Sequence, residues 1–295
     1  MSIHDELRAL ARALLADGAG WDQLAAAGFG GLDVAEAHGG SGATFAEVAI
    51  VAEEIGRTAA RVPFFGTAIL GAAAWPSAGE VTTAVALDGF RLEDGRLHGV
   101  ADFVVDAPVA EVVLVVAGDQ LVRADVTVEA QPVLDETREL GRVSADGIAA
   151  EVLGRVDVAG LRDRAALAIA ADAVGVAAAM LDATVAYARE RHQFGRAIGS
   201  FQAVKHQCAD MLVELTISRQ LVAAAVDDPT DRRAVAMAKS HATETAVAVC
   251  GTAMQLHGGI GYTWESGVHS YLKRALLDRA LFGSPREHRR TLTTM

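Results

Sequence analysis

The sequence predicts an α+β protein with N-terminal helices, a small antiparallel sheet or barrel in the middle and a bundle of four long helices at the end. Apolar residues recur at helical spacing near the N-terminus, and short β-branched runs alternate with Asp-Gly and Gly-Asp turns between 81 and 153. Long Ala-rich segments follow from about residue 161. We expect one compact unit with three regions, 1–77, 78–156 and 157–295.

Helix start signals define the N-terminal region. Ser2 with Asp5, and Thr44 with Glu47, have the spacing of capping boxes. They predict that one helix starts at Ser2 and another at Thr44. The expected helices cover 2–16, 21–27, 44–60 and 67–74, the last of them ending before Pro76.

The middle and C-terminal regions differ in the spacing of their apolar residues, which predicts strands in the first and helices in the second. The predicted strands are 81–87, 91–97, 103–105, 111–116, 120–126, 128–134 and 148–153. The predicted helices are 161–191, 201–227, 231–256 and 268–281, with a final turn at 286–293. Small residues such as Gly175 let helices approach closely, and we expect the Ala-rich helices to offer such surfaces for packing between subunits.

The composition excludes several classes of protein. A net charge of -12 disfavours general nucleic-acid binding. The sequence has no uninterrupted apolar run near the ~20 residues of a membrane span, and the N-terminus lacks the pattern of a signal peptide, so we expect a cytoplasmic protein. Cys208 and Cys250 lie far apart, and the histidines are not spaced as ligands, so no metal site is expected.

Two stretches in the C-terminal half suit phosphate binding. They are Arg-His-Gln-Phe-Gly at 191–195, continued by Ile-Gly-Ser-Phe-Gln at 198–202, and Gln-Leu-His-Gly-Gly-Ile-Gly-Tyr at 255–262. The guanidinium of Arg191 can bind phosphate oxygens in pairs, and Gly258 and Gly259 let a backbone approach closely. The alternative for Arg191 is a solvated arginine at a helix end that pairs with Glu190 or the helix dipole.

Both stretches, in this order and at helix ends, resemble the segments that contact the FAD diphosphate in the acyl-CoA dehydrogenase family. The Gly-Leu at 31–32 and the Gly-Gly-Ser-Gly at 39–42 also match, and the resemblance covers nearly the whole chain, which is short for the family. It implies the acyl-CoA dehydrogenase fold, and FAD shared across a subunit interface. The implied FAD contacts are Arg191, Gln193, Phe194, Gln202, Gln255, Gly258 and Gly259.

The family's flavin-ring contacts are missing here. The chain has no Thr-Glu-Pro-x-x-Gly-Ser-Asp segment between the N-terminal helices and the sheet. The family's Trp-Ile-Thr/Ser contact corresponds to Phe103-Val104-Val105, and Val105 has no hydroxyl to donate to the ring. The resemblance therefore implies that this chain does not hold its own flavin ring.

The family's catalytic base is missing as well. Its two usual glutamate positions correspond to Gly283 and Ala165, and Ala166 takes the place of an arginine that contacts CoA. Asp172 is a weak candidate for a replacement, because loss of solvent in an apolar stretch would make its carboxylate a stronger base. The alternative for Asp172 is an aspartate that faces solvent or is paired.

Two further carboxylates do not replace the base. Asp163 lies near the early base position with the wrong helix phase, and we interpret Glu265 as structural.

We therefore expect the non-catalytic subunit of a heteromeric acyl-CoA dehydrogenase, resembling the short degenerate chains of actinobacterial enzymes that act on bulky CoA thioesters such as those of steroid side chains. A homologous chain would supply the catalytic Glu and complete the FAD site in a dimer of dimers, a heterotetramer. One alternative is a flavin monooxygenase or oxidase of the same fold, which the missing ring segment disfavours. The other is a non-enzymatic assembly subunit, which the intact phosphate-binding stretches disfavour.

Overall fold

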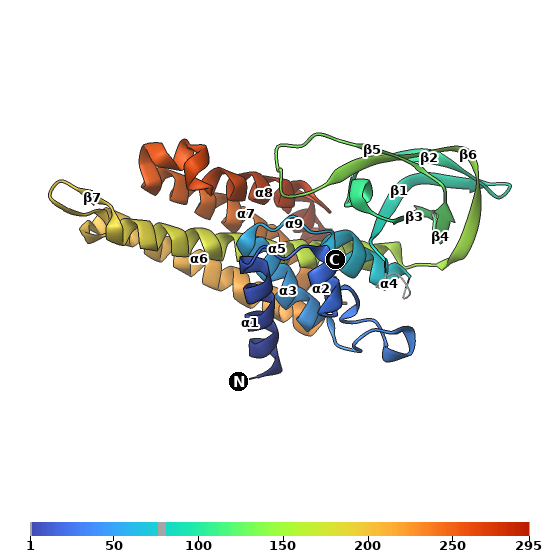
Figure 1. Cartoon of the computed structure of the whole chain (residues 1–295), viewed down its shortest axis with the longest axis horizontal. Helices are drawn as coiled ribbons and strands as arrows, with labels where there is room; N and C mark the ends of the chain where they lie inside the picture. The colour runs from blue at the N-terminus through green and yellow to red at the C-terminus, as the bar shows by residue number, and fades with distance from the viewer. Residues whose placement is uncertain (1, 76–80, 295) are drawn as a thin grey trace. The chain divides into compact units, whose positions relative to one another are not determined.

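The computed structural model describes residues 2–75 and 81–294 (Figure 1). The chain divides into two compact units. The first contains Met1–Val51 and Arg61–Ala168, and the second contains Ala52–Ala60 and Ile169–Met295. The predicted boundary between residues 77 and 78 lies outside the described residues.

The N-terminal helices begin at the predicted caps. They are α1 (Ile3–Ala16), α2 (Trp21–Ala26) and α3 (Phe45–Thr58), with short 3-10 turns η1 (Phe29–Gly31) and η2 (Glu36–His38) between α2 and α3. The Ser2 hydroxyl accepts from the Asp5 backbone N–H at 3.1 Å, and the Asp5 carboxylate accepts from the Ser2 N–H at 2.9 Å. The Glu47 carboxylate accepts from the Thr44 N–H at 2.8 Å, so both predicted capping interactions are confirmed.

The fourth predicted helix is a π-helix, η3 (Phe65–Gly71), followed by one α-turn, α4 (Ala72–Ala74). Side chains from distant segments bond to its backbone. Asp106 accepts from the Gly66 N–H at 2.7 Å, and Arg164 donates to the carbonyl oxygens of Ile69 at 2.6 Å and Ala68 at 3.1 Å. The wider turn therefore depends on tertiary contacts that residues 67–74 do not reveal by themselves.

The sheet has six strands: β1 (Thr83–Glu93), β2 (Arg96–Val105), β3 (Val112–Ala117), β4 (Gln120–Ala124), β5 (Thr127–Ala130) and β6 (Leu140–Arg155). The order is β2-β1-β3-β4-β6-β5, and a further pairing of β2 with β6 closes the sheet on itself. The 3-10 turn η5 (Ala107–Val109) connects β2 to β3. Leu97, Val115, Val122 and Val143 are buried inside this barrel.

Three details of the predicted sheet are wrong. The single strand predicted at 91–97 is the hairpin between β1 and β2, because Asp94 and Gly95 both have positive φ and turn the chain. Strand β6 begins at Leu140, well before the predicted 148. The pairing of β1 with β3 is parallel. Strand β2 runs antiparallel to β1 and also pairs with β6, and the chain then reverses through η5, so that β3 runs in the same direction as β1.

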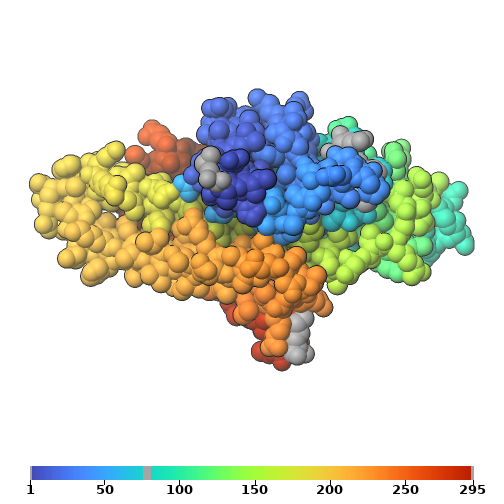
Figure 2. Space-filling model, turned by 90° about the horizontal axis from the view of Figure 1, so that it is seen from below, coloured from blue at the N-terminus to red at the C-terminus, as the bar shows by residue number. Residues whose placement is uncertain are grey.

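The second unit is helical. Its long helices are α5 (Val158–Glu190), which starts in the first unit, α6 (Gln202–Asp227), α7 (Arg232–His257), α8 (Val268–Ala280) and α9 (Pro285–Thr294). Short elements join them: the hairpin of β7 (His192–Gln193) and β8 (Arg196–Ala197), and the 3-10 turns η6 (Ile198–Ser200), η7 (Gly258–Tyr262) and η8 (Trp264–Ser266). Figure 2 shows α6 and α7 as adjacent yellow and orange surfaces. The predicted helical bundle is confirmed.

Helix α5 has the length and apolar composition of a membrane span, and 89% of its most apolar window is buried inside the protein. Its small residues pack within the chain. A Cβ at Gly175 would collide with the Glu53 carbonyl oxygen, and one at Gly56 with the Asp172 carbonyl oxygen. The prediction that the Gly175 surface packs between subunits is therefore wrong, because α3 already covers it.

Candidate functional site

The first phosphate-binding stretch forms a hairpin where α5 ends (Figure 1). The Ile198 N–H donates to the Arg191 carbonyl oxygen at 2.8 Å and closes the hairpin. Phe194 and Gly195 both have positive φ and form the turn, so the Phe194 side chain is 91% exposed. Gly199 lies against α5, where a Cβ would come within 2.9 Å of the Ala188 carbonyl oxygen.

The second stretch ends α7. Gly258 has φ +63° and ψ −142°, a conformation that favours glycine. A Cβ at Gly258 or at Gly259 would meet nothing within 4 Å, so this backbone faces open space. By contrast, Gly261 packs tightly, since a Cβ there would lie 2.7 Å from the Met254 carbonyl oxygen. The loop is therefore anchored at Gly261 and open at the two preceding glycines.

An aromatic pair joins the two stretches. The ring of Tyr187, on the last turns of α5, stacks on the ring of His257 at the end of α7, with centroids 4.4 Å apart and planes inclined by 17°. The Tyr187 hydroxyl donates to the His257 carbonyl oxygen at 3.3 Å. The sequence did not reveal this pair, because 70 positions separate the two residues and nothing local signals the contact.

All seven predicted FAD contacts are exposed and lie at the ends of α5 and α7 or the start of α6. Among the described residues nothing pairs with the guanidinium of Arg191, so the predicted alternative of an ion pair with Glu190 is absent there. Gln193 donates to the His192 carbonyl oxygen at 2.8 Å. Phe194 meets Phe201 edge-on, with ring centroids 6.1 Å apart.

These features fit the diphosphate and adenosine part of FAD. A free guanidinium suits a dianionic diphosphate, and open glycine backbone allows phosphate oxygens to approach closely. An exposed aromatic ring offers a stacking face for adenine. Arg196, which sequence analysis did not select, lies 4.0 Å from the centre of the Phe201 ring and stiffens the same hairpin.

Of the three positions that contact the flavin ring in the resemblance, Val104 and Val105 are buried and Phe103 is half exposed. Val105 is only 3% exposed and lies at the end of β2, beside Val104 in the barrel. Phe103 is half exposed with φ +57°, and its N–H donates to the Gln131 side chain at 2.6 Å. No hydroxyl is therefore directed out of the barrel at these three positions.

The two base positions are also closed. Ala165 is fully buried and Ala166 nearly so. Gly283 has φ +98°, and a Cβ there would lie 2.8 Å from Nε2 of His288. The Gly283 carbonyl oxygen accepts from the buried Lys239 ammonium at 3.1 Å, which holds this backbone in place. A glutamate at Gly283 would therefore be strained.

Asp172 is part of a buried ion pair. It is 3% exposed, and both of its carboxylate oxygens accept from the guanidinium of Arg274 on α8, with the Nε–Oδ2 distance 2.9 Å. Arg274 also donates to the Ala60 carbonyl oxygen at 3.2 Å. Of the two readings of Asp172, this geometry favours a paired, structural aspartate over a replacement base.

The two cysteines and the potential metal ligands are further reactive groups. Burial raises the pKa of the Cys250 thiol, and partial burial raises the pKa of Cys208, so neither favours a thiolate. Residues 2–75 and 81–294 contain no group of three or more potential metal ligands.

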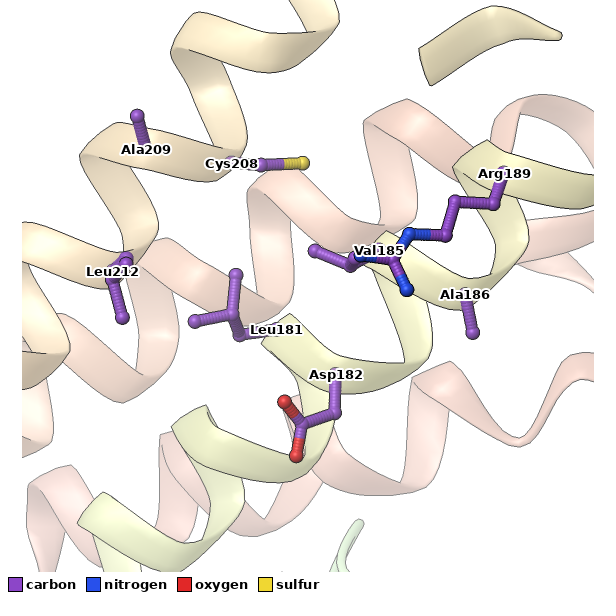
Figure 3. A pocket seen from close by; sticks show the side chains of 8 residues that line it. All are labelled: Leu181, Asp182, Val185, Ala186, Arg189, Cys208, Ala209 and Leu212. Atoms are coloured by element: carbon purple, nitrogen blue, oxygen red, sulfur yellow. The ribbon is translucent and has the colours of Figure 1, made fainter.

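Cys208 lines a surface groove of about 500 Å³ between α5 and α6 (Figure 3). The other lining residues are Leu181, Asp182, Val185, Ala186, Arg189, Ala209 and Leu212, none of which is a predicted FAD contact.

Comparison with known proteins identifies relatives over most of the chain. The family model described as the C-terminal domain of acyl-CoA dehydrogenase matches residues 160–294, and that of the N-terminal domain matches residues 3–79. The acyl-CoA dehydrogenase IpdE2 of Mycolicibacterium smegmatis is 38% identical over 267 residues, which cover 90% of this chain and 83% of that protein.

Solved structures are similar over nearly the same span. A variant of the Tcur3481-Tcur3483 steroid ACAD superimposes with a TM-score of 0.90 at 28% identity, covering 99% of this chain and 96% of that one. The ChsE4-ChsE5 complex from Mycobacterium tuberculosis gives a TM-score of 0.84 at 28% identity, covering 93% of this chain and 86% of that one.

Proposed function

The chain belongs to the acyl-CoA dehydrogenase family, and we propose that it is the non-catalytic subunit of a heteromeric enzyme of this family. One observation carries the proposal. The segments proposed to bind the FAD diphosphate are exposed at Arg191, Gly258 and Gly259. By contrast, the ring position Val105 is buried, and a glutamate at the base position Gly283 would be strained. The chain thus presents half of a flavin site.

A homologous chain is the partner that this half-site requires. The partner would supply the catalytic Glu and the contacts to the flavin ring, and the two chains would assemble as a dimer of dimers. The similarity to the Tcur3481-Tcur3483 steroid ACAD and to the ChsE4-ChsE5 complex supports a heteromer of related chains. It also supports a bulky CoA thioester, such as one with a steroid side chain, as the substrate.

This chain's own residues would bind and orient the cofactor. Arg191 would neutralise phosphate charge with paired hydrogen bonds. The open backbone at Gly258 and Gly259 would accept the close approach of phosphate oxygens, and Phe194 would cover the adenosine. FAD, when bound, supplies the hydride acceptor for the α,β-dehydrogenation.

Co-expression tests this function. The chain purified alone should hold little FAD, because it offers no ring contacts. Co-expressed with an acyl-CoA dehydrogenase-like chain that has the Thr-Glu-Pro segment and the glutamate, it should co-purify as a yellow complex with dehydrogenase activity. Stoichiometric FAD and acyl-CoA oxidation by the chain alone would contradict the proposal, and so would a partner that is equally active without this chain.

A further inference from the structure

The two cofactor-binding stretches come from the ends of different helices, so something must fix the spacing between them. The stacked rings of Tyr187 and His257 lie at that junction. Both residues are half-buried, while Arg191 and the backbone at Gly258 beside them are exposed. The stack therefore lies at the border of the helical core, and its two residues are close in sequence to the exposed residues that would touch a phosphate.

Each ring is connected to a phosphate-binding residue through the backbone. The Tyr187 carbonyl oxygen accepts from the Arg191 N–H at 2.8 Å, so the residue that carries the ring also fixes the start of the hairpin. On the other side, His257 immediately precedes Gly258, whose N–H donates to the Gln255 carbonyl oxygen. A shift of either ring therefore moves one stretch relative to the other.

Hydrogen bonds fix the orientation of the two rings. Nδ1 of His257 lies 2.7 Å from the Ala253 carbonyl oxygen. Because a carbonyl oxygen only accepts, Nδ1 carries the hydrogen in this contact. The Tyr187 hydroxyl then donates to the His257 carbonyl oxygen. The imidazole is thus held by its own helix, and the phenol is held against it by both the stack and the hydroxyl.

We infer that Tyr187 and His257 are positioning residues for the FAD diphosphate, and this inference rests on the proposed function. Their stack sets the separation between the Arg191 guanidinium and the open backbone at Gly258 and Gly259. A diphosphate that bridges both stretches binds more tightly when the stretches are already correctly spaced, because less freedom is lost on binding. Neither ring needs to touch the cofactor for this role.

The test compares FAD affinity and thermal stability in the complex with its partner chain. Tyr187→Leu removes the stack and should weaken FAD binding about tenfold, which is about 1.4 kcal/mol. Tyr187→Phe keeps the stack and loses only a long hydrogen bond, so its affinity should fall about twofold to threefold. FMN, which lacks the adenosine half and one of the two phosphates, should respond to Tyr187→Leu much less than FAD does.

A matched control distinguishes positioning from general packing. Tyr271 is another half-buried tyrosine of this unit, and its hydroxyl donates to the Arg57 carbonyl oxygen at 3.0 Å. Tyr271→Leu should lower the melting temperature at least as much as Tyr187→Leu but leave FAD affinity within about twofold. The double variant with Arg191→Ala is a second check, because Tyr187→Leu should add little once the guanidinium is gone.

Each outcome decides between the explanations. If Arg191→Ala weakens FAD binding and Tyr187→Leu does not, the positioning role is wrong while the proposed function stands. If neither substitution changes the affinity for FAD, the positioning role and the proposed function are both wrong. Should Tyr187→Leu fail to assemble, His257→Leu breaks the same stack from the other side, with His257→Phe as the conservative control. Failure of both leucine variants to assemble would make the pair structural and overturn the inference.

Discussion

The open end of the helical unit, where the proposed FAD contacts lie, contrasts with the positions where the resemblance places the flavin ring and the base. At the open end, Gly258 and Gly259 face empty space and Phe194 is almost fully exposed. At the other positions, Val105 is only 3% exposed at the end of β2 and Ala165 is fully buried. The proposed contacts to the FAD diphosphate are therefore free surface, whereas Val105 and Ala165 are protein interior.

Under the proposed function, this contrast is that of a family member that has lost catalysis and kept cofactor binding. Polar groups directed at a cofactor destabilise a chain when the cofactor's ring is held elsewhere, because a buried group without a hydrogen-bond partner is costly. Valine and alanine at these positions avoid that cost. Exposed glycines and an exposed arginine carry little such cost, so the chain can keep them without a loss of stability.

The largest expected effect concerns the buried ion pair. Asp172→Asn removes the carboxylate charge that both Asp172 oxygens present to the buried Arg274 guanidinium, so the free energy of unfolding should fall by about 3–5 kcal/mol. Turnover per bound FAD in the complex should change little. Urea unfolding and steady-state kinetics measure the two effects. A loss of turnover of about a hundredfold or more, with FAD content intact, would instead make Asp172 a catalytic residue.

Substitution of Arg191 tests the proposed contact to the FAD diphosphate. Arg191→Ala should weaken FAD binding in the complex by about tenfold to a hundredfold, because one charge-assisted phosphate contact contributes about 1.5–3 kcal/mol. Fluorescence titration with FAD measures it. Arg189→Ala, at an exposed arginine two residues earlier in the last turn of α5, is the control and should leave FAD affinity nearly unchanged. Equal behaviour of the two variants would show that Arg191 is only a helix-end charge.

A single substitution at the usual base position, Gly283, should not restore catalysis. Gly283→Glu places a side chain at φ +98° and close to His288, so it should destabilise the chain by about 1–3 kcal/mol. It should not create dehydrogenase activity in the chain without its partner. Gly267→Ala, also at positive φ but with open space around it, separates the backbone strain from the collision. An active, fully stable Gly283→Glu chain would refute the view that this base position is structurally closed.

The smallest expected effect lies outside both regions, at the cap of α3. Partial burial acts to raise the pKa of Glu47, but hydrogen bonds from Thr44 outweigh it and lower the pKa to about 2. Because the folded-state pKa is depressed, the carboxylate stabilises the fold above its unfolded pKa, and this contribution disappears as the pH falls from about 4.5 towards 2. Glu47→Gln should cost about 0.5–1 kcal/mol at pH 7.

The pH dependence of that difference is the measurement. Thermal or urea unfolding of Glu47→Gln and the unsubstituted chain should converge as the pH is lowered through this window. A difference that stays constant down to pH 2 would mean that packing of the side chain, and not its charge, stabilises the cap.

The sequence predicted the long helices well, because their apolar periodic runs are long and local signals mark some of their ends. Asp231 caps α7 through the N–H groups of Arg233 and Ala234, and α8 begins at the predicted Val268. The same local signals gave a wrong prediction at 91–97, where a turn at Asp94 and Gly95 interrupts a run of alternating apolar and polar residues. They also missed the first half of β6, whose pairing with β2 is a long-range contact.

By itself the sequence determined the α+β layout, the helix caps and the identity of the residues that suit a diphosphate, since these depend on residue type and short spacing. Tertiary structure alone decided the rest. It put Asp172 with Arg274, Gly175 against α3, and the ring of Tyr187 on His257. Each of these joins residues far apart in the chain, and a contact between distant residues has no local pattern that composition or periodicity could reveal.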